Sequence, residues 1–229
     1  MSTRLARLLA VLAGLAVAFF PASAARAGAP AADRLSRLDQ YLTTHVKAAG
    51  LPGASAAVVY RDQTLFLKGY GVRDLKSGEP VTPETVYPTG SNGKSFTGTA
   101  ILQLVEQGKV KLDDPVKEYI PWFELARPGE ADRITIRHLL SHTSGLRRNA
   151  DTVVWQDPQR IRPSLEEGVR ALRTERLWSE PWARYEYSNM NYVVLGRVVE
   201  VASGLSFGAY VQRYTLDPLG MQQTSLGGS

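Results

Sequence analysis

The most informative segment of this chain is Tyr87-Pro88-Thr89-Gly90-Ser91-Asn92-Gly93-Lys94-Ser95-Phe96-Thr97-Gly98-Thr99-Ala100-Ile101-Leu102. A glycine-containing turn runs into an apolar segment, which predicts a helix that begins at Ser91. Positions i and i+3 share one face of a helix, so the Lys94 amine is expected beside the Ser91 hydroxyl. A serine becomes a nucleophile when a basic group lies next to it, and a backbone N–H at a helix start can stabilise an oxyanion. Ser91 and Lys94 are therefore a candidate catalytic pair.

The spacing of this pair is not specific by itself. With 16 Ser and 7 Lys in 229 residues, roughly 0.5 Ser-x-x-Lys matches are expected by chance, so the context must decide. A solvated helix face would explain the pair almost as well. However, apolar residues nearly surround the segment from Phe96 to Val105, as in a helix at the centre of a domain, and Gly108 is a natural stop. A lysine in such a helix is costly to bury without partners.

Two other motif matches give competing interpretations. Gly93-Lys94-Ser95 is similar to the end of a phosphate-binding loop, but Pro88 stands where the first glycine of that loop belongs. Residues 204–208 fit the G-x-S-x-G nucleophile elbow around Ser206, which requires a histidine after the serine. All three histidines precede it, at positions 45, 138 and 142. We interpret Gly204 as the end of one helix and Ser206 as the cap of the next.

The first 27 residues have the pattern of a secretory signal peptide. Arg4 and Arg7 precede an apolar run from Leu8 to Phe20, and Ala22-Ser23-Ala24 or Ala25-Arg26-Ala27 is the cleavage site. A run of 13 residues is too short to span a bilayer. We expect export to the periplasm or the medium, and no integral membrane segment after cleavage. The chain has no cysteine, so it has neither disulfides nor a lipoprotein anchor cysteine.

Composition and charge describe the expected mature chain, residues 28–229, as one domain. The formal charge of +5 falls to +2 without Arg4, Arg7 and Arg26, which leaves 24 basic against 22 acidic residues. The arginines between positions 160 and 184 alternate with glutamates, which is typical of a solvated surface and not of a nucleic-acid track. The histidines lack metal-ligand spacing, so neither a metal nor another cofactor is expected. The oligomeric state stays open.

Periodicity and turn residues predict a mixed α+β domain, with a helical region packed on one flank of an incomplete antiparallel sheet. A hairpin is expected from strands at 54–60 and 64–70. Thr135 and Ser164 are expected helix caps, the latter in a capping box with Glu167. Residues 149–163 are polar and irregular. The helices are predicted at Asp33–Ala49, Ser91–Gly108, Ile134–Leu140, from Ser164 onward, Asn189–Ser203 and Phe207–Leu216.

Two further side-chain groups invite catalytic interpretations. His142 follows Ser141, but we favour a structural turn because triad members converge from separate segments. At Tyr187-Ser188-Asn189, Ser188 caps a helix and leaves the other two residues at its mouth. A phenol has a pKa near ~10 and is a base at neutral pH only if cations such as Lys94 lower it. An amide such as Asn189 can donate to and accept from a substrate. By themselves, a core tyrosine and an ordinary cap explain these residues better.

Taken together, the chain resembles the serine hydrolases related to class C β-lactamases and D-alanyl-D-alanine carboxypeptidases, which include esterases. Five blocks carry the resemblance in the same order over nearly all of the mature chain. They are Gly90-Ser91-x-x-Lys94-Ser95-Phe96-Thr97, Leu112-Asp113-Asp114-Pro115-Val116, Leu139-Leu140-Ser141-His142-Thr143-Ser144-Gly145-Leu146, Tyr187-Ser188-Asn189-x-x-Tyr192-x-x-Leu195-Gly196 and Pro218-Leu219-Gly220-Met221.

The resemblance implies a β-lactamase/transpeptidase-like fold in which Ser91 is acylated, Lys94 and Tyr187 shuttle its proton, and Asn189 orients the substrate. Water then releases the acyl group. Which group is the base stays open. Esters, D-alanyl peptides and β-lactams remain open as substrates, in that order, and no nucleic-acid partner is implied.

One element of the family pattern is missing. A third motif, Lys-[Thr/Ser]-Gly or His-x-Gly, is expected on a strand well after Asn189, but no lysine follows Lys117 and no histidine follows His142. Lys76-Ser77-Gly78 has the letters but precedes Ser91. We therefore expect the N-terminal part of a longer hydrolase or a truncated product with little activity. The alternative is a weak or inactive homologue that binds a peptidoglycan-like or acyl ligand.

Overall fold

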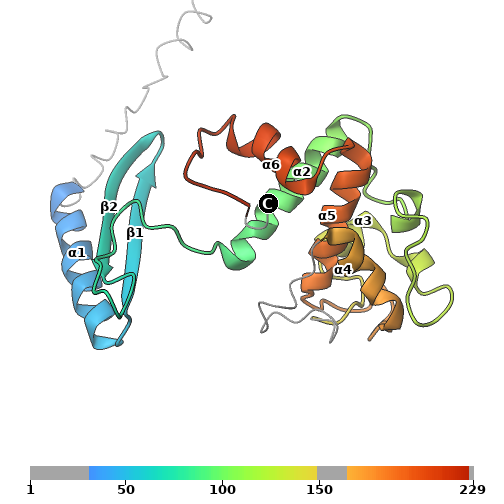
Figure 1. Ribbon diagram of the computed structural model, residues 1–229, viewed down its shortest axis with the longest axis horizontal. Coiled ribbons are helices and arrows are strands. Elements are labelled where there is room, and N and C mark those ends of the chain that lie inside the picture. Colours follow the sequence, from blue (N-terminus) through green and yellow to red (C-terminus); the bar gives the residue numbers. More distant parts are fainter. Residues whose placement is uncertain (1–30, 149–163, 227–229) are drawn as a thin grey trace, which may run out of the picture. The chain divides into compact units, whose positions relative to one another are not determined.

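The computed structural model describes residues 31–148 and 164–226 (Figure 1). The predicted signal peptide and the predicted irregular segment 149–163 lie outside these described residues. The backbone divides into two compact units, one up to Thr85 and one from Val86 onward. Each unit is described by itself below.

The first unit combines one helix with a two-stranded hairpin. Helix α1 spans Ala31–Ala48, and the antiparallel strands β1 (Gly53–Tyr60) and β2 (Gln63–Gly71) pair over their full length (Figure 1). The tight turn requires Arg61 to adopt a positive φ of 53°, and a register shift lies between Val58 and Val59. The predicted hairpin is confirmed, with the second strand beginning one residue earlier than expected.

A carboxylate on α1 is bound by two side chains of β2. Lys68 donates to both oxygens of Asp39 at 2.7 Å, and the Tyr70 hydroxyl donates to one of them at 2.9 Å. These bonds hold the pKa of Asp39 below its usual value. Burial, followed by the Asp39 carboxylate, raises the pKa of Tyr70 to about 12. The three side chains fix the packing of α1 against the hairpin.

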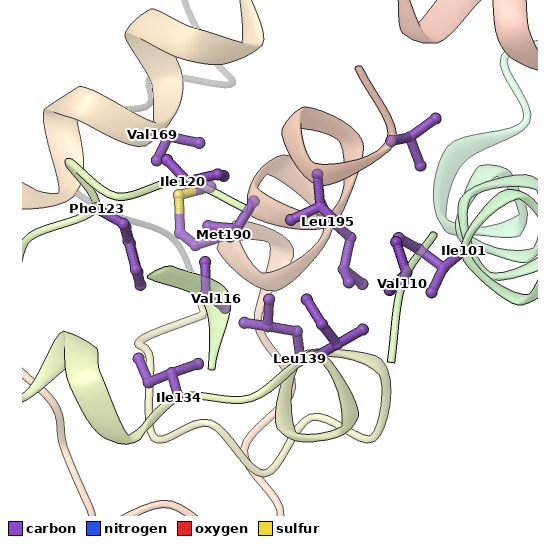
Figure 2. Packing of buried hydrophobic residues seen from close by; sticks show 14 of the residues in the cluster. Ile101, Val110, Val116, Ile120, Phe123, Ile134, Leu139, Val169, Met190 and Leu195 are labelled. Carbon is purple, nitrogen blue, oxygen red and sulfur yellow. The ribbon is translucent and has the colours of Figure 1, made fainter. Parts of the chain in front are cut away.

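The second unit is helical and is built around α5 (Asn189–Ser203). This helix packs against α2 (Gly93–Glu106), α3 (Ile136–Leu140), α4 (Leu165–Ala171) and α6 (Phe207–Val211). Shorter turns complete the unit: η1 (Gly90–Asn92), η2 (Val116–Glu118), η3 (Ala131–Arg133), η5 (Leu172–Thr174) and the π-helical η6 (Gln212–Leu216). Figure 2 shows side chains from these elements meeting in one core, including Ile101, Val116, Phe123, Leu139, Met190 and Leu195.

Helix α2 differs from its prediction in two respects. The chain first makes the 3₁₀ turn η1 around Ser91, and the α-helix begins at Gly93. The expectation of a helix buried on nearly all sides was wrong, because only part of the surface of α2 is covered where α5, α6 and η6 pack against it. The side chain of Leu102 is 51% exposed. The buried face consists of Thr97, Ala100, Ile101 and Leu104.

Local capping signals fixed most helix ends. Ser188 caps α5, whose bounds agree with the prediction, and Gly204 ends it with a φ of 73°. Thr135 caps α3 and forms a reciprocal capping box with His138. Helix α3 begins two residues after the predicted Ile134, because Ile134 is extended and its carbonyl accepts the Val116 N–H at 2.8 Å. The predicted helix at 207–216 consists of α6 followed by η6.

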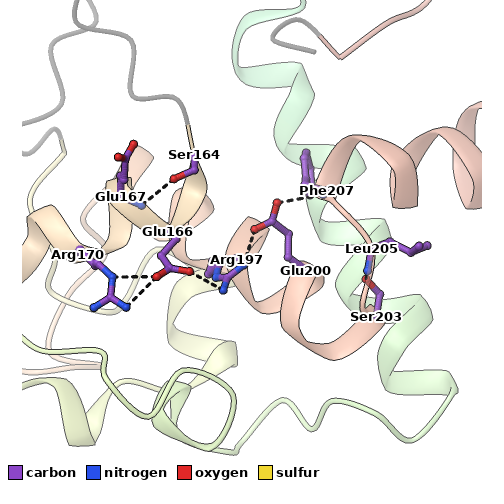
Figure 3. A network of polar contacts seen from close by, with 9 residues as sticks. All are labelled: Ser164, Glu166, Glu167, Arg170, Arg197, Glu200, Ser203, Leu205 and Phe207. Carbon is purple, nitrogen blue, oxygen red and sulfur yellow. Dashed lines mark hydrogen bonds and ion pairs between the residues drawn. The ribbon is translucent and has the colours of Figure 1, made fainter.

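An ion-pair network joins α4, α5 and the start of α6 (Figure 3). Arg197 donates to Glu166 at 2.8 Å and to Glu200 at 3.0 Å, and Glu166 also accepts from Arg170 at 2.8 Å. Glu200 accepts the backbone N–H of Phe207 at 3.2 Å. Ser164 caps α4 by accepting from the Glu167 N–H at 3.2 Å. The network fixes the long helix α5 between its neighbours.

Within residues 31–148 and 164–226, no single helix has the length and apolarity needed to cross a membrane. One pair of neighbouring segments, Asn189–Ser203 with Phe207–Leu216, meets those two criteria together, and it is bent by 76°.

Candidate active site

The four side chains predicted as a site lie together in the second unit. The Ser91 and Tyr187 hydroxyl oxygens are 2.6 Å apart, and either atom can be the donor. Lys94 donates to the Ser91 oxygen at 3.2 Å and to the Asn189 side-chain oxygen at 2.8 Å. Two segments that are almost 100 positions apart therefore converge on one lysine. The i, i+3 relationship expected for Ser91 and Lys94 holds, although Ser91 lies in a 3₁₀ turn.

The turn before α2 presents Ser91 at the surface. Gly90 has a φ of 53°, a left-handed conformation that side chains disfavour, and it directs the chain into η1. Ser91 is exposed, whereas Lys94 on the first turn of α2 is half-buried. Because its amine binds the two neighbouring side chains, the lysine does not extend into solvent. The alternative of a merely solvated helix face is thereby wrong for Lys94.

The buried residue Ser188 positions Tyr187 and Asn189. Its hydroxyl accepts the Met190 N–H at 3.1 Å, which caps α5, and donates to the Arg147 carbonyl at 2.6 Å. The Asn189 N–H donates to the Arg148 carbonyl at 2.8 Å. Ser188 and Asn189 are thus bound to the segment 147–148, and the helix cap fixes the backbone that carries the side chains of Tyr187 and Asn189.

His142 is part of the support of the site. It adopts a φ of 58°, and its Nδ1 accepts the Ser188 N–H at 3.1 Å. Its buried ring lies 4.5 Å from the Tyr187 ring and 5.2 Å from the Tyr192 ring. Burial, and then the Lys94 charge, lower the pKa of His142. The prediction of a structural turn is confirmed, since the hydrogen bonds of this imidazole in the described part of the chain lead to Ser188 and Asn191.

The segment 142–148 runs beside the segment 178–189. Backbone N–H groups of Trp178, Trp182 and Glu186 donate to carbonyls of residues 145, 143 and 142 at 2.8–2.9 Å. Gly145 has a φ of 81°, and a Cβ atom there would lie 2.1 Å from the Ser179 carbonyl oxygen. Only glycine permits this close approach. The paired segments hold His142 and the chain before Tyr187 in register.

The two tyrosines near Lys94 differ in the direction in which their pKa is shifted. Its ammonium lies 4.9 Å from the Tyr187 ring centroid and 5.5 Å from that of Tyr192. The ammonium and the hydrogen bond with Ser91 lower the pKa of Tyr187. Burial raises the pKa of Tyr192, whose hydroxyl donates to the Leu140 carbonyl at 3.2 Å. Tyr187 is therefore the phenol that ionises more easily, and it is the one beside Ser91.

Sequence reasoning missed Arg148. Its guanidinium carbon lies 5.6 Å from the Tyr187 ring centroid, and its charge also lowers the pKa of that phenol. The adjacent basic residues Arg147 and Arg148 are visible in the sequence. The closeness of Arg148 to Tyr187 depends on the hydrogen bonds that the carbonyls of residues 147 and 148 accept from Ser188 and Asn189, which no local pattern indicates.

The G-x-S-x-G match around Ser206 has a structural role. The Ser206 hydroxyl accepts the Ala209 N–H at 3.2 Å and caps α6, as predicted, so Ser206 is not a nucleophile elbow. Among the described residues, no cluster of three or more histidine, aspartate or glutamate side chains has a geometry that could hold a metal ion.

Comparisons with known proteins identify relatives of this chain. A family model described as Beta-lactamase matches residues 38–229. The chain is 33% identical over 195 residues to Protein flp of Staphylococcus aureus (strain N315), and 30% identical over 192 residues to the teichoic acid D-alanine hydrolase of S. aureus (strain MRSA252). Each alignment covers 84% of this chain. The octameric penicillin-binding protein homologue from Pyrococcus abyssi superimposes with a TM-score of 0.70 at 33% identity, over 82% of this chain.

These alignments cover only part of each relative: 38% of Protein flp, 44% of the teichoic acid hydrolase and 43% of the Pyrococcus protein. The family match extends over well more than half of this chain and includes Ser91, Lys94, Tyr187 and Asn189. The fold is accordingly the β-lactamase/transpeptidase-like fold, here with its helices and a two-stranded antiparallel sheet. The chain belongs to the β-lactamase family of serine hydrolases.

Proposed function

We propose that the protein is an exported serine hydrolase that cleaves an ester or amide through an acyl-enzyme on Ser91. The observation that carries this proposal is the 2.6 Å contact between the Ser91 and Tyr187 hydroxyls, with Lys94 3.2 Å from the same serine oxygen. A nucleophile, a proton acceptor and a cation that favours the ionised acceptor meet at one point. That combination is what activates a serine.

In this proposal the Tyr187 phenolate removes the Ser91 proton while the serine oxygen bonds to the substrate carbonyl carbon. The tetrahedral intermediate collapses when the bond to the leaving group breaks, and Tyr187 returns the proton to the leaving alcohol or amine. Water then attacks the acyl-enzyme, gives its proton to Tyr187 and releases the acid, and Ser91 regains its proton. Two easier steps replace one difficult one.

Lys94 and Asn189 have supporting roles in the proposed mechanism. The Lys94 ammonium keeps the pKa of Tyr187 low, which raises the fraction of phenolate. Asn189 accepts from Lys94 at 2.8 Å, which fixes the ammonium beside the serine, and its amide orients the substrate. The Ser91 N–H lies in the first turn of η1, where helical N–H groups lack partners within the helix, so it is one donor for the oxyanion.

Intact-mass analysis after incubation with a fluorophosphonate tests the nucleophile. We expect one adduct on the native chain, none on Ser91→Ala, and an unchanged adduct on Ser95→Ala, which removes an exposed serine four residues away. An adduct that persists in Ser91→Ala would contradict the proposal. A folded chain that forms no adduct would favour the alternative, a catalytically weak or inactive homologue that binds a peptidoglycan-like or acyl ligand.

Export is a separate part of the proposal, and its support is the sequence pattern of residues 1–27. Expression in a bacterium followed by N-terminal sequencing of the periplasmic and secreted fractions tests it. We expect the mature chain to begin at Ala25 or Gly28, directly after one of the two small-residue sites. An uncleaved chain that stays in the cytoplasmic fraction would overturn it.

A further inference from the structure

We propose that Arg148 forms an anion subsite beside the reacting serine, so that the preferred substrate is an ester or amide that carries a negatively charged group such as a carboxylate or phosphate. This inference rests on the proposed function and deepens it, because it names the chemical class of the substrate. Its first support is position. The Arg148 guanidinium lies 5.6 Å from the Tyr187 ring centroid, and Tyr187 contacts Ser91 at 2.6 Å. The cation and the reacting serine oxygen are therefore both neighbours of the Tyr187 side chain.

The second support is the charge of the site. In the part of the chain that the structure describes, neither Lys94 nor Arg148 has a carboxylate partner within ion-pair distance. Lys94 contacts a hydroxyl, an amide oxygen and the rings of Tyr187 and Tyr192, none of which is a carboxylate. Glu186, the residue directly before Tyr187 in sequence, is paired with Arg184 at 3.7 Å. Among the described residues, the two positive charges beside Tyr187 therefore lack carboxylate partners. The Tyr187 phenolate of the proposed mechanism balances one of these charges, and a negatively charged substrate group would balance the other.

The third support is that Arg148 is held in place but open to solvent. Its carbonyl accepts the Asn189 N–H at 2.8 Å, and the preceding carbonyl accepts the Ser188 hydroxyl at 2.6 Å. The backbone at Arg148 is thus tied to the helix cap that positions Tyr187 and Asn189. The side chain is exposed. A guanidinium presents a planar set of donors that matches a carboxylate or a phosphate in two parallel hydrogen bonds.

Several other arginines in the described part of the chain lack this combination. Arg133, Arg137, Arg170 and Arg197 are each paired with an aspartate or glutamate. Arg213 also lies over a tyrosine ring, at 5.3 Å from the centroid of Tyr214, but it is on η6. Gln103, near the end of α2, donates to the Tyr214 carbonyl. At a rise of 1.5 Å per residue, Gln103 lies roughly 15 Å along α2 from Gly93, the start of the helix near Ser91.

Three chromogenic esters of matched size test the proposal. The neutral reference is p-nitrophenyl butyrate, mono-p-nitrophenyl succinate carries a carboxylate on the acyl part, and the butyrate ester of 5-hydroxy-2-nitrobenzoic acid carries it on the leaving group. We compare kcat/KM for the native chain, Arg148→Gln, Arg148→Lys and Arg213→Gln. The last variant is the matched control, since it removes an arginine that also lies over a tyrosine.

We expect Arg148→Gln to lower kcat/KM for at least one anionic ester by about tenfold or more, the loss typical of one hydrogen bond between charged groups. For the neutral ester we expect a smaller loss. It arises because removal of the Arg148 charge raises the pKa of Tyr187, an effect weaker than the loss of a direct hydrogen bond to the substrate. Arg148→Lys should restore part of the preference, and Arg213→Gln should leave all three rates unchanged. The ester that responds tells whether the anion belongs to the acyl part or to the leaving group. Equal losses for all three esters, or none, would overturn the proposal.

A binding measurement separates this inference from the proposed function. In Ser91→Ala the esters cannot acylate the serine, so calorimetry gives their dissociation constants directly. Tighter binding of an anionic ester than of the neutral one, lost in Ser91→Ala/Arg148→Gln, would support the subsite even if the native chain hydrolyses nothing. If both variants bind the anionic and neutral esters equally, the subsite does not exist, whatever the fluorophosphonate result.

Discussion

The hydroxyl oxygens of Ser91 and Tyr187 lie 2.6 Å apart although the two residues are 96 positions apart in the chain. Ser91 lies in a 3₁₀ turn before α2, and Tyr187 immediately precedes the cap of α5. Helices α2 and α5 pack directly against one another. The contact is therefore a product of helix packing, and the following predictions probe what depends on it.

Replacing Tyr187 with phenylalanine removes the proposed proton acceptor and leaves the ring that packs on His142. We expect acylation of Ser91 to slow by about 10²–10⁴-fold, the usual contribution of general acid–base catalysis. The rate of fluorophosphonate labelling, followed by intact mass, measures this effect. Tyr185→Phe is the control, because it removes an exposed tyrosine hydroxyl two residues earlier. Equal rates for Tyr187→Phe and the native chain would rule out the proposed role.

The pH dependence of acylation reports the charge of Lys94. Phenolate is the active form of Tyr187 in the proposed mechanism, so the rate rises with pH through the pKa of that phenol, which lies below the ordinary 10.0 because of the Lys94 ammonium. Lys94→Met removes the cation, so the pKa rises and the ascending limb moves to higher pH. The labelling rate between about pH 6 and about pH 10 measures the shift. Lys109→Met, which removes an exposed lysine, should leave the limb in place. A limb that does not move in Lys94→Met would assign the titration to another group.

Two buried histidines make the stability of the second unit depend on pH. Burial lowers the pKa of His138 and His142 below 6.5 in the folded chain. Between the folded pKa and 6.5, the unfolded chain binds more protons than the folded one. The free energy of unfolding therefore rises with pH through that window and levels off above it.

Urea denaturation at about pH 5 and about pH 8 measures this slope. We expect His138→Gln and His142→Asn each to reduce it. Glutamine retains a side chain able to complete the capping box of α3, and asparagine tolerates the positive φ at position 142. A slope that persists in the double variant would mean that other groups cause it.

Substitution of Gly145 should disturb the pairing that supports the site. A left-handed conformation costs a non-glycine residue about 1–2 kcal/mol, and a Cβ at Gly145 would in addition lie 2.1 Å from the Ser179 carbonyl oxygen. We expect Gly145→Ala to lower the free energy of unfolding by more than this strain alone. Gly204→Ala is the matched control, since its φ is 73° but a Cβ would meet nothing within 4 Å. Urea denaturation of both variants gives the comparison, and equal losses would show that the close approach costs nothing.

Much of the local structure could be predicted from the sequence. Ser188 and Gly204 determined the bounds of α5, and Thr135 and Ser206 determined the starts of α3 and α6. These features are predictable because a cap satisfies backbone groups only a few residues away. The i, i+3 spacing of Ser91 and Lys94 was also a local property, and it held.

The rest depended on contacts between distant segments. By sequence alone Tyr187 was better explained as a core residue, and only the packing of α2 on α5 brings it to Ser91. The exposed face of α2 could not be foreseen, because the composition of a helix does not state which neighbours cover it. Local sequence signals thus predicted the caps at Thr135, Ser188 and Ser206 and the spacing of the pair that could form a nucleophile. They did not predict that Lys94 lies between Ser91 and Asn189 or that Arg148 is near Tyr187, because these contacts join distant segments of the chain and arise from packing.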